Sequence, residues 1–226
     1  MVERAAVNRE VEGSTPSWGV TLFLKMKTGN DHYYTENPKS KLILYKIDVL
    51  IKNEPFSFYS ATGIFSKKKL DNGSRLLIET AQIKKKAKIL DIGCGSGVIG
   101  IYTALKNPGC EILLSDINKR AIEIAEKNIK FYSLDNAKAM HSDLYSSFDD
   151  TFDIILSNPP QAAGKDICFG IIDGAYDHLN KNGTLQIVAR KKKGGESLRK
   201  HMEKKFGNAR AIARGSGFQI YLSVKE

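Results

Sequence analysis

The sequence lacks any long hydrophobic run. No segment of its 226 residues reaches about 18 consecutive apolar side chains, the length that a membrane-spanning helix needs. The N-terminus is too polar before its short apolar run VTLFL to be a signal peptide. The hydrophobic content of 42% and the charged content of 27% are ordinary for a globular chain. We therefore expect neither a membrane protein nor a disordered one.

Cysteine and histidine are scarce and scattered. The three cysteines, Cys94, Cys110 and Cys168, include no CxxC pair, and the four histidines do not cluster at the spacing of metal ligands. This pattern excludes a disulfide scaffold and a zinc site as leading interpretations. We expect reduced thiols in or near the core of a cytoplasmic protein, and no metal.

Negative charge is in the minority, and the formal net charge is +10. Two segments carry the excess: residues 66–88 and residues 190–205 each hold eight Lys or Arg side chains against two acidic ones. Basic segments of this kind favour a polyanionic partner such as RNA, through neutralisation of phosphates. The alternative is two solvated lysine faces, because charge reports attraction rather than a site.

Three parts of the chain differ in pattern. Residues 1–25 have no sustained period, and we interpret them as a disordered tail or as a translated non-coding stretch, with Met26 as the true start. Residues 26–66 contain partly alternating apolar positions, which predict a small β-hairpin extension. Residues 67–226 are expected to form the main domain.

The main domain is organised around KILDIGCGSGVIGI, residues 88–101. Apolar residues end at Asp91 in a pattern typical of a buried parallel strand, and a glycine-rich loop and a helix beginning near Val98 follow. Glycines allow a tight turn and let the backbone approach a ligand closely. The stretch therefore predicts a cradle for a cofactor.

Strand and helix patterns alternate on both sides of this stretch. Before it, Asn72-Gly73-Ser74 predicts a helix start with Ser74 as its cap. After it, the alternation continues to two final strands near residues 209–214 and 218–224. This rhythm predicts an α/β fold: a Rossmann-like, doubly wound, mostly parallel sheet in which the last two strands add an antiparallel edge.

Two cofactors fit the loop. Residues 95–100 match the GxGxxG fingerprint of dinucleotide-binding enzymes, so an NAD enzyme is one reading. Asp116 ends the next strand, where a carboxylate can accept ribose hydroxyls of either NAD or S-adenosylmethionine. Asp91 separates the two, because its charge suits a cofactor with a cationic amino-acid end and repels a pyrophosphate.

DIGCGSG, Asp116, HSDL (residues 141–144) and SNPPQ (residues 157–161) together resemble the class I S-adenosylmethionine-dependent methyltransferases. HYYTENPKS and GIFSKKKLDNGSRLLIE narrow the resemblance, over residues 31–226, to the small-domain methyltransferase family. The best-known members of that family are guanine-N2 methyltransferases of small-subunit ribosomal RNA of the RsmC type. The resemblance implies an RNA N-methyltransferase whose cofactor is S-adenosylmethionine.

The resemblance also implies a role for each motif. Asp91, Gly93, Gly95 and Gly97 would surround the methionine part of the cofactor. Asp116 would hold the ribose, and Ile117, Asp143 and Leu144 would contact the adenine. At Asn158-Pro159-Pro160, the Asn158 oxygen and the Pro159 carbonyl would each accept a hydrogen bond from one of the two N–H groups of the acceptor amine. Proline at 159 and 160 stiffens this loop and offers no N–H donor.

Gln161 departs from the family pattern, in which an aromatic residue usually follows the prolines and stacks on the target base. Phe65, Tyr59 and Tyr33 are candidates to supply that stacking, and Gln161 is a candidate to hydrogen-bond a base edge. A packing role in the core is the alternative for Phe65. Arg190, Lys191 and Lys192 follow a strand and are candidates to bind RNA phosphates.

Two other functions remain open. Release-factor glutamine methyltransferases share Asn-Pro-Pro, although they have a tyrosine after the prolines and a helical N-terminal domain. A non-catalytic RNA-binding module is the third reading, and the intact Asp91, Asp116 and Asn158 argue against it. The particular RNA, the nucleotide and the oligomeric state do not follow from the sequence.

Overall fold

The structure, a computed structural model of the chain, describes residues 21–22, 34–160, 164–191 and 194–226. Strands and helices alternate along the main domain, as the sequence predicts. In chain order the elements are β1 (Thr21–Leu22), β2 (Leu44–Ile51), β3 (Glu54–Ala61), α1 (Asn72–Thr80), β4 (Lys88–Ile92), α2 (Val98–Lys106), β5 (Glu111–Asp116), α3 (Lys119–Phe131), β6 (Ala137–His141), β7 (Phe152–Ser157), α4 (Lys165–His178), β8 (Leu179–Arg190), α5 (Gly195–Phe206), β9 (Arg210–Gly215) and β10 (Phe218–Val224).

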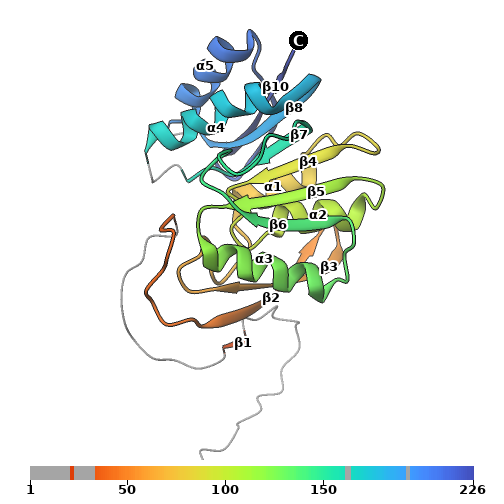
Figure 1. Cartoon of the computed structure of the whole chain (residues 1–226), viewed down its shortest axis with the longest axis vertical. Coiled ribbons are helices and arrows are strands. Elements are labelled where there is room, and N and C mark those ends of the chain that lie inside the picture. Colours follow the sequence, from red (N-terminus) through yellow and green to blue (C-terminus); the bar gives the residue numbers. More distant parts are fainter. Residues whose placement is uncertain (1–20, 23–33, 161–163, 192–193) are drawn as a thin grey trace, which may run out of the picture.

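The main sheet has the strand order β6-β5-β4-β7-β8-β10-β9 (Figure 1). Strands β6, β5, β4, β7 and β8 are parallel, and β10 runs antiparallel to both β8 and β9. The predicted Rossmann-like sheet with an antiparallel edge is thus confirmed. Strand β4 lies between β5 and β7, where the strand order reverses, and sheets of this type bind ligands at the carboxyl ends of the strands beside that point.

The sheet is covered by helices on both faces, which explains why its central strands β4 and β7 are almost entirely buried and mostly apolar. On β4, Ile89 belongs to the core on the α1, α2 and α3 side, and Leu90 belongs to the core on the α4 and α5 side. Both side chains are fully buried. Among the described helices, none is both long and apolar enough to cross a bilayer.

The N-terminal extension is an antiparallel hairpin of β2 and β3, as predicted, and Thr21–Leu22 of the expected tail pairs with β2. The hairpin lies beside α3 (Figure 1). Asn128 of α3 joins the two: its Oδ1 accepts a hydrogen bond from Tyr59 N at 2.7 Å, and its Nδ2 donates to Tyr59 O at 2.9 Å. The rest of residues 1–25 lies outside the described residues.

The prediction that Ser74 caps helix α1 is wrong. The N-cap is Asp71, whose Oδ2 accepts hydrogen bonds from Gly73 N at 2.9 Å and Ser74 N at 3.1 Å. Asp and Ser are both good caps, and the carboxylate takes this place three residues earlier than expected. Ser74 consequently lies buried in the first turn, and its hydroxyl group contacts another part of the chain.

Candidate functional site

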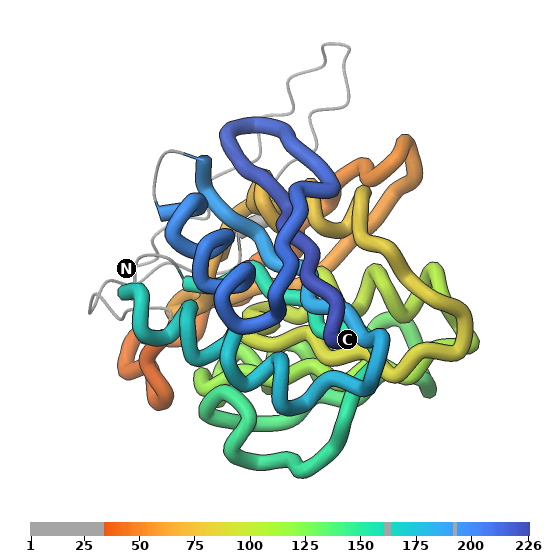
Figure 2. The backbone as a smooth tube through the Cα atoms, turned by 90° about the horizontal axis from the view of Figure 1, so that it is seen from above, coloured from red at the N-terminus to blue at the C-terminus, as the bar shows by residue number. Residues whose placement is uncertain are grey.

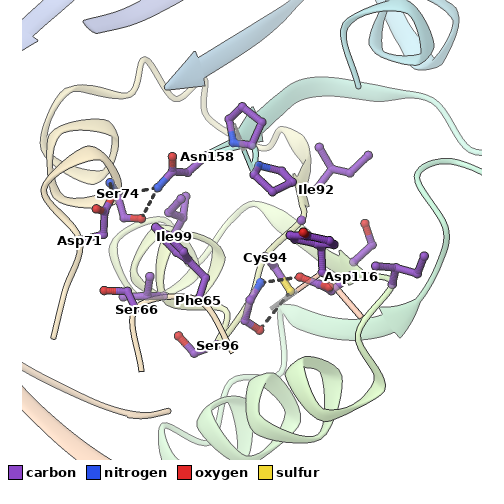
Figure 3. A pocket seen from close by; sticks show the side chains of 18 of the residues that line it. Phe65, Ser66, Asp71, Ser74, Ile92, Cys94, Ser96, Ile99, Asp116 and Asn158 are labelled. Carbon is purple, nitrogen blue, oxygen red and sulfur yellow. Dashed lines mark hydrogen bonds between the residues drawn. The ribbon is translucent and has the colours of Figure 1, made fainter. Parts of the chain in front are cut away.

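A cavity lies at the carboxyl edge of the main sheet, over the ends of β4, β5 and β7 (Figure 3). Its walls come from the glycine loop, from the ends of β5, β6 and β7, and from the chain before β2 and around the start of α1. Lining residues include Tyr34, Phe65, Ser66, Lys69, Asp71, Ser74, Ile92, Gly93, Cys94, Gly95, Ile99, Asp116, Ile117, Asp143, Leu144, Asn158, Pro159 and Pro160. Most of the predicted cofactor and acceptor residues therefore share one cavity.

The glycine loop turns sharply between β4 and α2. Gly93, Gly95 and Gly97 all have positive φ, at 69°, 58° and 79°, a conformation that other residues adopt with strain. A Cβ at Gly97 would lie 2.8 Å from the Leu114 side chain, so this position also needs the smallest residue. Gly93 and Gly95 line the cavity, whereas Gly97 begins helix α2 behind it.

Asp91 lies beneath the loop with no exposed surface. Its Oδ2 accepts a hydrogen bond from Gly100 N at 2.8 Å, and its Oδ1 is buried without a partner among the described residues. Burial, and then repulsion from Asp116, raise the pKa of Asp91 to about 7. A buried carboxylate oxygen without a donor is a place where a cationic group would be stabilised.

Asp116 ends β5 at the opposite wall of the loop. Its Oδ2 accepts from Gly95 N at 2.8 Å, and its Oδ1 accepts from Asn118 N at 2.8 Å. Burial raises the pKa of Asp116, and these two backbone donors oppose the rise. Asp116 thus holds the glycine loop in shape, and both Asp116 and the next residue, Ile117, line the cavity.

Asp143 and Leu144 follow β6 and complete this end of the cavity. Leu144 has φ of 49°, and its carbonyl accepts a hydrogen bond from the Ser142 hydroxyl at 2.8 Å. A ring nitrogen of His141 lies 2.9 Å from Ile117 O and links this loop to the end of β5.

Asn158, Pro159 and Pro160 follow β7 and line the other part of the cavity. The Asn158 Nδ2 donates to Asp71 Oδ2 at 3.0 Å and to Ser74 Oγ at 2.9 Å. Figure 3 shows both bonds, with the Asn158 side-chain oxygen turned away from Asp71 and Ser74. Because an ionised carboxylate only accepts hydrogen bonds, the nitrogen of the amide must face Asp71.

The stacking candidates separate in the structure. Phe65 lines the cavity, close to Ile99 and Ser66 (Figure 3). Tyr59 does not line it: its ring packs edge-on against Phe131, with centroids 5.5 Å apart, on the hairpin side of α3. Of the three alternative candidates, Tyr59 is therefore placed away from the cavity, because β3 directs it toward α3. Tyr33 and Gln161 lie outside the described residues.

Residues 34–41 form a segment fastened across the start of α3, and Figure 2 shows it, in orange, along the outside of the molecule. Arg120 donates hydrogen bonds from Nη2 to Pro38 O and Ser40 O, at 3.0 and 2.7 Å. Its Nη1 donates to Ser40 Oγ and Thr62 O, both at 2.9 Å. Lys119 N donates to Glu36 O at 3.1 Å, and Tyr34, two residues before Glu36, lines the cavity.

Two of the predicted phosphate-binding residues, Arg190 and Lys191, do not line the cavity. Arg190, the last residue of β8, has its guanidinium 5.2 Å from the centre of the Phe218 ring. Lys191 N donates to Gly217 O at 3.0 Å, and its side chain borders a separate surface pocket with Arg199 and Arg214. Lys192 lies outside the described residues.

Sequence reasoning assigned no site role to Tyr34, Lys69, Asp71 or Ser74, which all line the cavity. Asp71 and Ser74 are 87 and 84 residues from Asn158 in the chain, so no local pattern connects them. One sequence signal could have pointed to them. Asp71 and Ser74 are both cap-forming residues at the start of one helix, and because a helix needs only one cap, the other residue is free for a different role. Among the described residues, no group of three or more His, Cys, Asp or Glu side chains is arranged to hold a metal.

Residues 55–222 match the model of the family described as the methyltransferase small domain. A Bacillus subtilis protein named uncharacterized protein YbxB is 36% identical over 199 residues, covering 87% of this chain and 99% of its own length. The Haemophilus influenzae ribosomal RNA small subunit methyltransferase C is 37% identical over 177 residues, covering 76% of this chain. The chain spans only 52% of that relative's length.

Among solved structures, a T. thermophilus 16S rRNA N2 methyltransferase in complex with AdoMet and guanosine has the same fold. Its TM-score is 0.73, with 23% sequence identity, over 84% of this chain and 52% of the other. A methyltransferase from Pyrococcus furiosus gives a TM-score of 0.57 at 22% identity, over 64% of this chain and 77% of the other.

Proposed function

Because the chain belongs to the methyltransferase small domain family and is an S-adenosylmethionine-dependent methyltransferase, we propose that it methylates the exocyclic N2 amine of a guanine in small-subunit ribosomal RNA. The observation that carries the proposal is the fixed amide of Asn158, which lies in one cavity with the glycine loop. The names of the methyltransferase C relatives support ribosomal RNA as the partner.

The residues present fit the cofactor. S-adenosylmethionine supplies an electrophilic methyl group on a positively charged sulfur, next to an amino-acid end that carries an ammonium group. Asp91 offers a buried carboxylate oxygen without a donor, which suits that ammonium. In the proposal Gly93 and Gly95 let the backbone approach the methionine part, and Gly97 supports the turn from behind the cavity. Asp116 accepts hydrogen bonds from ribose hydroxyls.

The adenine end of the cofactor is assigned to the part of the cavity formed by the residues that follow β5 and β6. Ile117 and Leu144 offer apolar surface to a ring, and Asp143 offers acceptors to its amino edge. Tyr34 joins this wall from the segment that Arg120 fastens. The N-terminal segment is therefore part of the proposed cofactor site.

Replacing Arg120 by alanine is expected to weaken S-adenosylmethionine binding about tenfold, because the hydrogen bonds of a charged donor to residues 34–41 are lost and Tyr34 is no longer held in the wall. Isothermal titration calorimetry measures the change. The matched control is Arg199→Ala on α5, because neither Arg199 nor its partners Glu196 and Glu203 line the cavity. Equal affinities of the Arg120→Ala and Arg199→Ala variants would contradict a role for this segment.

The acceptor part of the site addresses a chemical difficulty. An exocyclic amine on a nucleobase is a weak nucleophile, because its lone pair is delocalised into the ring. In the proposal, the Asn158 Oδ1 and the Pro159 carbonyl each accept a hydrogen bond from one N–H group of the amine, and together they hold the amine in one orientation. No strong base is required, since the proton can leave once the new bond has formed. The contribution of the chain is position and electrostatics.

The substrate is proposed to approach over basic and aromatic residues. Phe65 lies in the cavity wall where a base can stack, and Lys69 adds a cation to the same wall. Arg190 ends β8 at the same edge of the sheet, and Lys191 follows it. In this proposal Lys192 and Gln161 extend the contacts to phosphate and base.

Changing Lys191, Lys192 and Lys193 together to alanine is expected to weaken RNA binding and to flatten its dependence on salt. Each phosphate contact that is lost lowers the slope of log affinity against log salt by about 0.7 for single-stranded RNA. Fluorescence anisotropy over a salt series gives both numbers. An unaltered slope would identify these lysines as a solvated surface without phosphate contacts.

The proposed reaction is tested by incubating the purified chain with labelled S-adenosylmethionine and small-subunit ribosomal RNA that lacks the modification. We expect label in the RNA, and N2-methylguanosine after digestion and mass spectrometry. A different methylated nucleoside would contradict the guanine-N2 assignment. Label in a release factor rather than in RNA would favour glutamine methylation, which also uses an Asn-Pro-Pro sequence.

A further inference from the structure

Asp71 and Ser74 hold the amide group of Asn158 from the side opposite to its oxygen (Figure 3). We propose that these two residues are positioning residues for methyl transfer: they fix the Asn158 amide in the one orientation that presents its oxygen to the acceptor amine. The inference rests on the proposed function, because it assumes that Asn158 receives the acceptor.

The orientation matters because the two ends of an amide have almost the same shape and opposite hydrogen-bonding character. With Oδ1 toward the substrate, Asn158 accepts a hydrogen bond from an N–H group of the amine. With Nδ2 toward the substrate, two donors face each other and the amine is no longer held. Neither orientation is preferred by packing alone, so the neighbours of the amide must select it.

Asp71 and Ser74 provide that selection. An ionised carboxylate accepts hydrogen bonds only, and its bond to Nδ2 is charge-assisted, so reversal of the Asn158 amide would bring two oxygens together. The Ser74 hydroxyl accepts from the same nitrogen, and the Ser74 side chain is buried. Both protons of the Asn158 NH2 group are therefore engaged on the side away from the oxygen.

The holding residues are themselves fixed in place. Asp71 caps helix α1, and its Oδ2 also accepts from Gly73 N and Ser74 N. The helix start is pressed against the sheet, because a Cβ on Gly73 would lie 2.7 Å from the Val188 side chain and 3.0 Å from Phe218. The start of α1 thus acts as a rigid mount for a side chain at the end of β7.

The test uses Asp71→Ser and the control Asp71→Asn. Serine keeps the helix cap but is too short to reach Asn158, whereas asparagine keeps both the cap and an acceptor oxygen. We expect Asp71→Ser to lower kcat by about tenfold to a hundredfold, the range for a lost hydrogen bond to a charged group, without a change in cofactor affinity. Asp71→Asn should restore kcat to within a few-fold of wild type.

A double-mutant cycle with Asn158→Ala separates positioning from a merely structural effect. If Asp71 acts through Asn158, Asp71→Ser should cause no further loss of single-turnover rate in the Asn158→Ala background. Independent losses that multiply in the double variant would overturn the proposal, as would wild-type kcat in Asp71→Ser. Thermal unfolding of each variant identifies any loss of fold.

A second readout needs no substrate. The side-chain NH2 signal of Asn158, assigned by its disappearance in Asn158→Ala, should exchange with solvent slowly in the wild type and at least about tenfold faster in Asp71→Ser. Unchanged exchange would overturn the positioning role. A wild type that keeps this protection and methylates no RNA would instead contradict the proposed function alone.

Discussion

Asn158→Ala is expected to reduce methyl transfer by about 10²–10³-fold, the range seen when one positioned hydrogen-bonding group of an active site is removed. The loss should appear in kcat, because the variant cannot orient the acceptor amine. Cofactor binding should change little, because the proposed cofactor contacts come from the glycine loop and from the ends of β5 and β6. Single-turnover assays and calorimetry measure the two quantities separately.

The chain offers a matched control for this variant. Asn180 also donates a hydrogen bond from Nδ2 to a carboxylate, Asp153 Oδ1, at 2.9 Å. It lies at the start of β8, at the opposite edge of the sheet from the cavity. Asn180→Ala should therefore keep full activity. Unchanged turnover in Asn158→Ala would refute the acceptor role, whatever the control does.

The second large effect concerns Asp91 and pH. In the folded protein the pKa of Asp91 is raised to about 7 from its ordinary value of 3.8, chiefly by burial. Between these two values the folded state keeps a proton that the unfolded chain has lost. The contribution of this proton to the free energy of unfolding is complete below pH 3.8 and is lost as the pH rises through about 7. The total loss is about 4 kcal/mol of unfolding free energy.

Urea unfolding of the cofactor-free protein from pH 4 to 8 measures this loss, with Asp91→Asn as the control. Asparagine stays neutral at every pH, so the part of the pH dependence that comes from Asp91 should vanish in the variant. Equal slopes in the two proteins would show that Asp91 does not titrate in this range.

The same linkage gives a test of the proposed cofactor contact. An ammonium group beside Asp91 would favour the ionised carboxylate, so binding of S-adenosylmethionine at pH 6.5 should release most of one proton. Calorimetry in two buffers with different ionisation enthalpies counts the protons. Binding without proton release in the wild type would place the cationic end of the cofactor elsewhere.

Much of this molecule follows from local sequence. Residues 88–101 contain a buried strand, a glycine turn and a helix start in one continuous stretch, and each of these has a signature within a few residues. The Rossmann-like sheet follows from the alternation of such stretches, because short connections and apolar strands leave few other arrangements. The hairpin of β2 and β3 follows from its alternating pattern in the same way.

Local sequence did not decide the outcome at positions where two or more local arrangements were equally favourable. Asp71 and Ser74 are both strong cap residues, and the choice between them depends on where the first turn of α1 meets the sheet. Tyr59 is an aromatic residue on a strand, and only the packing of β3 on α3 decides that it faces Phe131 and not the cavity.

The sequence by itself determined the fold, the glycine loop and the presence of Asn-Pro-Pro, because each of these can be recognised from residues that are close together in the chain. The tertiary structure alone decided which way the Asn158 amide faces, because its partners Asp71 and Ser74 stand 87 and 84 residues away and meet it only when α1 packs beside the end of β7. It also decided that Arg120 fastens residues 34–41 beside the cavity. Hydrogen bonds depend on direction as well as distance, and direction exists only once the chain has folded.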